Sequence, residues 1–362
     1  MTKRQINYLG CVGLMVASGI GAVAPSSVAA APSHAAAVHR VLPGQSIQAA
    51  VNAARPGDVI DIARGTYRES VTITTSGLTL RGAGDRTVIT PAAGVSRDAC
   101  ARAGNGICVL GKNARPLRDV RVRSLKVTSF KKNGIWASRT DLLRVSGVTV
   151  EKNGNWGIAV ERSVRGVFQG NVARANAESG IFLSNTTDTE AGALDARRTL
   201  VSGNHLAGNR IGLTIRRLRN VVVEGNRITG NCAGVFLVGD EGRPRAGALL
   251  VRFNEVGQNN KFCPKTERLP AIQGAGVVLT GVEKTTVDRN VIWGHRASKP
   301  ASPFSGGVVL FKSIVGSPSS DNTIRDNVLV GNSTPDIANR DTGQGNSFGG
   351  NFCRKSEPAG IC

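Results

Sequence analysis

The sequence predicts an all-β chain that winds as a parallel β-helix, a solenoid in which each coil adds short strands to stacked sheets. Two repeating motifs, described below, carry this prediction, together with apolar runs of only three to five residues cut by Gly and Asn. Helical solenoids need long segments with a 3.6-residue period, and leucine-rich repeats need regularly spaced leucines. Neither pattern is present. The 362 residues, 40% of them hydrophobic, are enough to build a core.

The first motif is a glycine followed by a short aliphatic strand. It occurs at Gly106, Gly134, Gly157, Gly180, Gly212, Gly234, Gly276 and Gly307. The shortest intervals are 22 and 23 residues, so we interpret the longer ones as one coil plus an insertion. Residues one and three positions after each glycine are apolar and are predicted to face the core.

The second motif is a pair of asparagines five residues apart with an apolar residue between them. The pairs are Asn171/Asn176, Asn204/Asn209, Asn226/Asn231, Asn254/Asn259 and Asn327/Asn332, and Asn290 is followed at the same spacing by His295. Asparagine tolerates the left-handed turn conformation, and its amide can hydrogen-bond the Asn of the next coil. The motif therefore predicts two Asn-lined turns per coil.

Each open end of such a solenoid needs a cap, since unpaired strand edges invite aggregation. Residues 43–56 predict an N-terminal helix with Ser46 as its N-cap and a stripe formed by Ile47, Ala50, Val51 and Ala54. Residues 58–62 are expected to form the first strand. The segment from about 340 to 362 has no strand pattern and predicts the C-terminal cap.

Residues 1–37 have the pattern of a secretory signal peptide and leader. Lys3 and Arg4 precede an apolar run that ends in small residues. We therefore expect a secreted protein without a transmembrane segment in its mature chain. Loss of this leader removes two basic residues and no acidic ones, so the net charge falls from +21 to +19.

Six cysteines remain in the mature chain, and an even number in a secreted protein predicts disulfides. Cys353–Cys362 would close the C-terminal cap. Cys232 and Cys263 follow the Asn turns of adjacent coils and can pair there, which leaves Cys100–Cys108 to close a short loop. Zinc binding is disfavoured because no CxxC motif occurs and no His lies near a Cys.

Residues 44–84, GQSIQAAVNAARPGDVIDIARGTYRESVTITTSGLTLRGAG, resemble the opening of right-handed parallel β-helix proteins of the pectin-lyase-like group, including NosD-like and PbH1-repeat proteins. The resemblance covers roughly 41–362 and implies one single-stranded right-handed β-helix domain over 38–362. It does not fix an activity, since the group includes lyases, hydrolases, esterases and epimerases. The Asp-Pro-His-Asp pattern of the alginate epimerases and the Asp-Asp pair of the polygalacturonases are absent.

Members of this group mostly bind polymers along one outer ladder of strands. The glycine-led strands are the candidate ladder here, and at the second position after the glycine an aromatic recurs on every second coil: Trp136, Phe182 and Phe236. That interval is about 9.5 Å, the scale of a disaccharide. The alternative is that these rings pack beneath the insertions.

Charged and amide side chains follow at the fourth and fifth positions. We predict Arg216, Arg217 and Glu161 as catalytic residues, and Arg139, Arg162, Asn185, Asp240 and Lys312 as substrate contacts beside the three aromatics. Arginine suits carboxylates, and in some members of the group it removes the proton in β-elimination. A hydrolase needs two facing carboxylates, so a lyase is the better fit.

No cofactor is firmly predicted. Calcium needs several oxygen ligands, and Asp188, Glu190 and Asp240 on the two insertions are the candidate set. The alternative for every charged residue named here is a solvated face in an arginine-rich chain.

The strong positive charge predicts an anionic partner outside the cell. We expect a monomer that binds an acidic polysaccharide. A more specific form of this hypothesis is that the protein also cleaves the polymer by β-elimination. The alternative is a non-catalytic, wall-associated or adhesive module. Nucleic acid is disfavoured because aromatics make up only 4% of the chain.

Overall fold

The computed structural model describes residues 35–94, 98–187, 189–267, 269–298 and 302–362. The chain from Ala36 to Cys362 forms one compact unit. The predicted signal peptide and leader lie, except for their last three residues, outside the described part. Across the described residues, no helix combines the length and the apolar character needed to cross a membrane.

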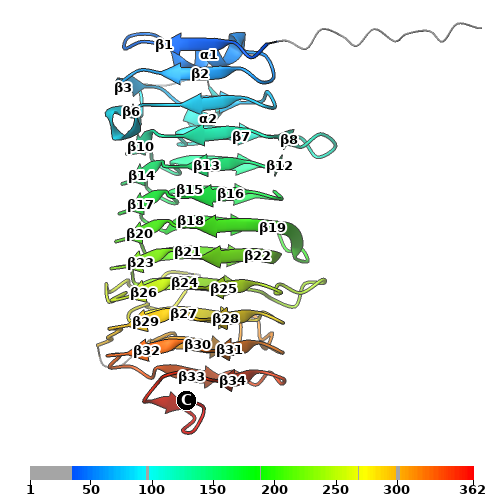
Figure 1. The fold of residues 1–362 in the computed structure, drawn as a ribbon, viewed down its shortest axis with the longest axis vertical. Helices are drawn as coiled ribbons and strands as arrows, with labels where there is room; N and C mark the ends of the chain where they lie inside the picture. The colour runs from blue at the N-terminus through cyan, green and yellow to red at the C-terminus, as the bar shows by residue number, and fades with distance from the viewer. Residues whose placement is uncertain (1–34, 95–97, 188, 268, 299–301) are drawn as a thin grey trace, which may run out of the picture. The chain divides into compact units, whose positions relative to one another are not determined.

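The chain forms three long parallel sheets, here called A, B and C, whose strands stack coil upon coil (Figure 1). Sheet A contains, in spatial order, β1 (Val38–Val41), β2 (Val59–Ile62), β5 (Thr79–Arg81), β9 (Arg121–Arg123), β13 (Arg144–Ser146), β16 (Val167–Gln169), β19 (Leu194–Ser202), β22 (Leu218–Glu224), β25 (Leu250–Arg252), β28 (Thr286–Asp288), β31 (Thr323–Arg325) and β34 (Ser347–Gly349).

Sheet B contains β3 (Gly65–Arg68), β6 (Thr87–Thr90), β10 (Lys126–Thr128), β14 (Thr149–Glu151), β17 (Val172–Arg174), β20 (His205–Ala207), β23 (Arg227–Thr229), β26 (Glu255–Gly257), β29 (Val291–Trp293) and β32 (Val328–Val330). Sheet C contains β4 (Val71–Ile73), β7 (Ile107–Leu110), β11 (Ile135–Ser138), β15 (Ile158–Glu161), β18 (Ser179–Ser184), β21 (Ile211–Arg216), β24 (Ala233–Val238), β27 (Ala275–Thr280), β30 (Gly306–Phe311), β33 (Ile337–Arg340) and β35 (Ser356–Glu357). These parallel pairings confirm the predicted all-β solenoid, and most coils contribute one strand to each of the three sheets.

The core is a continuous aliphatic column inside the three sheets. On sheet C, Ile135, Ile158 and Ile181 pair in register and are fully buried. Val145 of sheet A and Val150 of sheet B face the same interior. The residues predicted to face inward therefore do so.

Two buried ladders of side-chain amides run along the solenoid. The first joins Asn171, Asn204, Asn226, Asn254, Asn290, Asn327 and Asn351, and each Nδ2 donates to the Oδ1 of the next coil over 2.8–3.0 Å. The second joins Asn153, Asn176, Asn209, Asn231 and Asn259 over 2.9–3.1 Å. Each Oδ1 also accepts a backbone N–H, which satisfies turn groups that would otherwise be buried without a partner.

His295 continues the second ladder. Its Nε2 lies 3.2 Å from Asn259 Nδ2 and its Nδ1 lies 3.0 Å from Asn332 Oδ1. A neutral ring with its proton on Nδ1 satisfies both contacts, since Asn259 donates and Asn332 accepts. Complete burial lowers the pKa of His295 to about 4.

The N-terminal cap is helix α1 (Ile47–Ala53), whose N-cap residue is Ser46 as predicted. Ser46 Oγ accepts the Ala49 N–H over 3.2 Å, and the Glu69 carboxylate accepts the Ile47 N–H over 2.7 Å. The first strand, however, is β1 rather than the segment at 58–62. It precedes the helix and pairs with β2, so sheet A begins one strand earlier than the sequence indicates.

The C-terminal segment also contains strands, contrary to expectation. The short strands β34 and β35 extend sheets A and C by one coil, and Phe348 and Ile361 pack against the core. The backbone of the preceding coil supplies the hydrogen-bond partners of these two strands. They therefore form without an alternating hydrophobic pattern in their own sequence. The remaining elements are η1 (Gly84–Arg86), α2 (Ala99–Arg102) and the pair β8 (Leu117–Arg118) and β12 (Thr140–Asp141).

The structure contains three disulfides, Cys100–Cys108, Cys232–Cys263 and Cys353–Cys362. These are the three pairs named from the sequence. The second one ties the loop after β26 to the start of β24, on the outside of sheet C.

Candidate functional site

The outer face of sheet C carries one in-register column of side chains. Its members are Cys108, Trp136, Ala159, Phe182, Thr214, Phe236, Val278 and Val309. The predicted column is thus present as a single line across the coils. The first half of the column, from Cys108 to Thr214, and the second half, from Phe236 to Val309, are covered by different groups.

In the first half the column carries a stack of three aromatic rings. Trp156 lies between Trp136 and Phe182. Its ring centroid is 4.1 Å from that of Phe182, with an interplanar angle of 5°, and 6.4 Å from that of Trp136, with an angle of 16°. The small side chain of Ala159 at the register position between the rings leaves room for the indole. Both tryptophans are half-buried, whereas Phe182 is buried.

Trp156 was missed from the sequence because strict alternation fails at the repeating glycine. A side chain on Gly157 would meet Val150 of the core, and Ile158 is also buried in the core. Two successive residues therefore face inward, and the residue before the glycine faces outward. A tryptophan immediately before a repeat glycine is the signal that could have found it.

In the second half the column is covered by the loops that follow β26 and β29. Phe236 is 2% exposed and meets Phe304 edge-on at 5.1 Å between centroids. The Cys232–Cys263 disulfide, Ile272 and Val309 complete this second hydrophobic cluster. The structure therefore places Phe236 inside a core and away from solvent.

Beside the aromatic stack, the turn from sheet C to sheet A carries two half-buried arginines, Arg139 and Arg162. Arg139 Nη1 donates to Ser138 Oγ over 3.1 Å, and its Nε donates to Asn113. Arg162 lies 3.8 Å from Glu161, between Nε and Oε1. Each arginine follows the column residue of its own strand, Trp136 or Ala159, by three positions.

Glu161 and Arg216 hold the insertion that follows β18. The Thr187 N–H donates to Glu161 Oε1 over 3.2 Å, and Arg216 Nη1 donates to the Thr187 carbonyl over 3.5 Å. Asn185 fixes the other end of the loop by donating to the Gly192 carbonyl over 2.7 Å. All three predicted site residues therefore contact this loop.

Arg217 and Asp240 form an ion pair between the two insertions, in which the arginine is buried and the carboxylate is half-buried. The Arg217 side chain is 6% exposed, and its Nη1 donates to the Thr189 carbonyl over 2.8 Å and to Thr186 Oγ1 over 3.2 Å. Asp240 also accepts the Gly242 N–H over 3.0 Å. A general base must reach the proton that it removes, and this guanidinium faces protein groups on every side.

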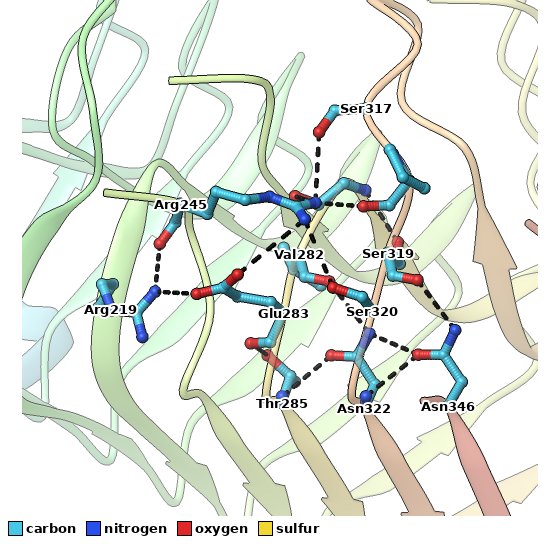
Figure 2. A network of polar contacts seen from close by, with 12 residues as sticks. Arg219, Arg245, Val282, Glu283, Thr285, Ser317, Ser319, Ser320, Asn322 and Asn346 are labelled. Carbon is cyan, nitrogen blue, oxygen red and sulfur yellow. Dashed lines mark hydrogen bonds and ion pairs between the residues drawn. The ribbon is translucent and has the colours of Figure 1, made fainter. Parts of the chain in front are cut away.

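The same edge is braced further along the solenoid. Figure 2 shows Arg219 and Arg245 around Glu283, with Arg219 Nη1 donating to Glu283 Oε1 over 2.8 Å. Arg245 Nη2 donates to Ser317 Oγ over 3.3 Å and to the Pro318 carbonyl. Successive loops on this edge are therefore cross-linked by arginines, which gives the arginine-rich composition a structural use.

The remaining predicted contacts are scattered. Lys312 is exposed at the turn after β30, beyond the covered half of the face, and Glu190 is exposed on the first insertion. Asp188 lies outside the described residues. Among the residues that the structure describes, no three His, Cys, Asp or Glu side chains gather closely enough to hold a metal ion.

These features define a parallel β-helix with an aromatic ladder on one outer sheet and loops along one edge. The chain belongs to the family described as right handed beta helix region, whose model matches residues 76–246 and 133–327. A search of curated proteins gives no match.

Several solved structures share the fold. The A-module of mannuronan C-5 epimerase AlgE6 from Azotobacter vinelandii is 20% identical, with a TM-score of 0.56 over 84% of this chain and 88% of that one. DFA-IIIase from Arthrobacter chlorophenolicus A6 is 12% identical, with a TM-score of 0.58 over 86% and 94% of the two chains. Pectate lyase Pel9A is 16% identical, with a TM-score of 0.50 over 82% and 76%. At these identities the likeness establishes the fold alone.

Proposed function

We propose that this protein is secreted and binds an acidic polysaccharide across the outer face of sheet C, between β7 and β21. The observation that carries the proposal is the stack of Trp136, Trp156 and Phe182, which presents two half-buried indoles, while Arg139 and Arg162 follow the strands β11 and β15 beneath it. Indole surfaces pack against the C–H groups of sugar rings, and guanidinium groups bind carboxylates.

Two further facts support an acidic polymer as the ligand. The net charge of +19 that remains without residues 1–37 attracts anionic chains over distances longer than any single contact. Two of the structurally similar enzymes are named for uronate polymers, mannuronan and pectate. Because the polymer is long, binding extends along the coils rather than into a closed cavity.

The contacts of the predicted catalytic residues favour a binding module over a lyase. Glu161 and Arg216 hold Thr187, and Arg217 is paired with Asp240 inside the molecule. β-Elimination remains the finer hypothesis for this face. It predicts that the wild type forms an unsaturated product, which is detected by its ultraviolet absorbance. Arg216→Ala should not form this product, whereas the control variant Arg227→Ala, on sheet B, should still form it.

The proposal is tested by titration calorimetry with alginate and polygalacturonate, with neutral dextran as the control polymer. Trp156→Ala should weaken binding of an acidic polymer about tenfold, since one stacked sugar contact contributes on the order of 1–3 kcal/mol by analogy with base stacking. Trp293→Ala, at the third tryptophan of the chain, is the matched control on sheet B. Equal affinities for all three proteins, or no binding of any acidic polymer, would refute the proposal.

A further inference from the structure

The outer face of sheet A carries charged side chains whose signs alternate along its later coils. Glu224, Arg252, Asp288 and Arg325 occupy one column, and each lies in register with the next. Arg252 Nη2 lies 2.8 Å from Glu224 Oε2, and Arg325 Nε lies 3.6 Å from Asp288 Oδ1. Opposite charges stabilise such a cross-strand pair, and like charges destabilise it. This part of the face therefore satisfies its own charges.

Strand β9 breaks the alternation on both of its sides. Arg123, in the same column, lies opposite Arg81 of β5, and Arg121 lies opposite Arg144 of β13. These are the only like-charged pairs in the parallel strand pairings of the described residues. The other charged pairs have opposite signs: Arg40/Asp61, Asp61/Arg81, Arg118/Asp141, Glu151/Arg174, Asp195/Arg219, Glu224/Arg252, Arg227/Glu255, Arg252/Asp288 and Asp288/Arg325. We call Arg81, Arg121, Arg123 and Arg144 the arginine face.

Carboxylates balance the arginine face only in part. Arg121 Nη2 lies 2.9 Å from Asp119 Oδ2, and Arg144 pairs with the same carboxylate, so one negative charge serves two guanidinium groups. Arg81 Nε lies 2.9 Å from Asp61 Oδ1. The side chains of Arg81, Arg121 and Arg144 are 40%, 43% and 36% exposed, so their guanidinium groups remain accessible to a ligand.

Arg123 is exposed and has no carboxylate partner among the described residues. From β1 to the turn before β16, the outward columns of sheet A and the turn residues beside them carry twice as many cations as carboxylates. They are Arg40, Arg81, Arg86, Arg118, Arg121, Arg123, Arg144 and Arg165 against Asp61, Asp85, Asp119 and Asp141. Neighbouring segments do not cancel this surplus: they place Arg55 against Asp58, Lys126 and Arg174 against Glu151, and Lys112, Arg115, Arg139 and Arg162 against Glu161.

The arginine face suits a ligand that carries repeated carboxylates. Its outward columns from β1 to β13 contain no aromatic ring, so binding there depends on guanidinium groups, which form paired hydrogen bonds with carboxylates. Strands β5, β9 and β13 are successive neighbours in the sheet, so Arg81 and Arg144 are separated by two strand spacings, about 9.5 Å. An acidic polymer presents several charges over that distance, whereas a single small anion presents one.

We propose that the arginine face is a second binding face for the acidic polysaccharide, so that one copy of this protein bridges two polymer chains. The inference rests on the function proposed above. Sheets A and C are different sides of the solenoid, so a polymer on the aromatic stack leaves the outward arginines of sheet A free. Two faces on one rigid body cross-link a long polymer by multivalent contact.

The test is titration calorimetry of the full mature chain, at physiological salt, with an oligogalacturonate too short to reach both faces. The wild type should bind two oligomers. The double variant Arg121→Ser/Arg123→Ser should bind one, since the loss of each charged hydrogen-bond donor weakens the second site about tenfold. Arg252→Ser/Arg325→Ser is the matched control, because it removes the same charge from the alternating part of the sheet, and it should still bind two.

Two further measurements separate binding from folding. With long polygalacturonate, the wild type and the control should form turbid complexes, and the arginine-face variant should not. Arg123→Ser should leave the thermal midpoint unchanged or raise it, because it removes the like-charge contact with Arg81. A lower midpoint would assign Arg123 to folding and overturn the proposal.

The remaining outcomes distinguish this proposal from the function on which it rests. One oligomer per wild-type chain, with an affinity that Trp156→Ala lowers, would overturn the second face and leave the site on sheet C intact. Binding that Trp156→Ala does not change and the arginine-face variant loses would overturn both. An equal loss in the control variant would show that binding follows net charge alone, which also overturns the proposal. Capture of polyphosphate but of no oligogalacturonate would assign the arginine face to a phosphate polymer and overturn it as well.

Discussion

The two halves of the outer face of sheet C share one register and still have opposite environments. Trp136 and Phe236 occupy the same column, and each pairs with neighbours at the position two residues after the repeat glycine. Trp136 belongs to a half-open aromatic stack, whereas Phe236 is buried against Phe304 under two loops. The register fixes which face a side chain occupies, but the insertions decide whether that face is a surface or a second core.

The largest expected effect is the loss of packing in the covered half. Phe236→Ala should lower the free energy of unfolding by about 4 kcal/mol, because a buried ring is lost and a cavity remains beneath the loops. Trp136→Ala, in the same column of the open half, should cost clearly less. Chemical denaturation of both variants provides the measurement, and equal losses would contradict the distinction between the two halves.

The ion pair between the insertions is the next test. Arg217→Ala should cost about 3 kcal/mol, since it leaves the Asp240 carboxylate half-buried without its partner. Arg227→Ala, whose partner lies on the surface, should cost well below 1 kcal/mol. Thermal unfolding compares the two. If Arg217→Ala were as stable as the control, the pair would not hold the loops that border the open half.

His295 should make the covered half sensitive to acid. Its pKa is about 4 in the folded chain, against an ordinary value of 6.5, so the unfolded chain binds the proton more readily. The contribution of a neutral His295 to stability is therefore complete above pH 6.5 and is lost as the pH falls from 6.5 to about 4. The loss amounts to about 3 kcal/mol.

The variant His295→Asn sharpens that prediction, because asparagine is the residue that the rest of the ladder uses. Its stability should vary less with pH between 6.5 and 4 than that of the wild type. The measurement is the midpoint of urea unfolding at several pH values. Parallel curves for the two proteins would show that another group titrates in this range.

The smallest expected effect concerns the open half. Trp136→Phe should keep the fold and retain most of the affinity for an acidic polymer, since one aromatic ring replaces another in the stack. Trp136→Ala should weaken binding about tenfold with a loss of stability on the order of 1 kcal/mol. Calorimetric titration and thermal unfolding of the same samples separate the two quantities. A loss of stability without a change in affinity would assign the stack to folding alone.

Local chemistry that repeats along the chain determined the fold. The inward Ile and Val positions, the two Asn ladders and the Ser46 cap can be read from the sequence, since each depends on a period or on a side chain within a few residues. The same holds for the place of the outward column, because alternation within a strand fixes it.

The tertiary structure alone decided what the outward residues contact. The burial of Phe236 depends on Phe304, which lies 68 positions later in the chain, and the insertion of Trp156 depends on the small Ala159 beside it. Arg217 and Asp240 meet only because two insertions fold against the same edge. Such contacts join segments of different coils, and no period in the sequence encodes how a loop folds back over its sheet.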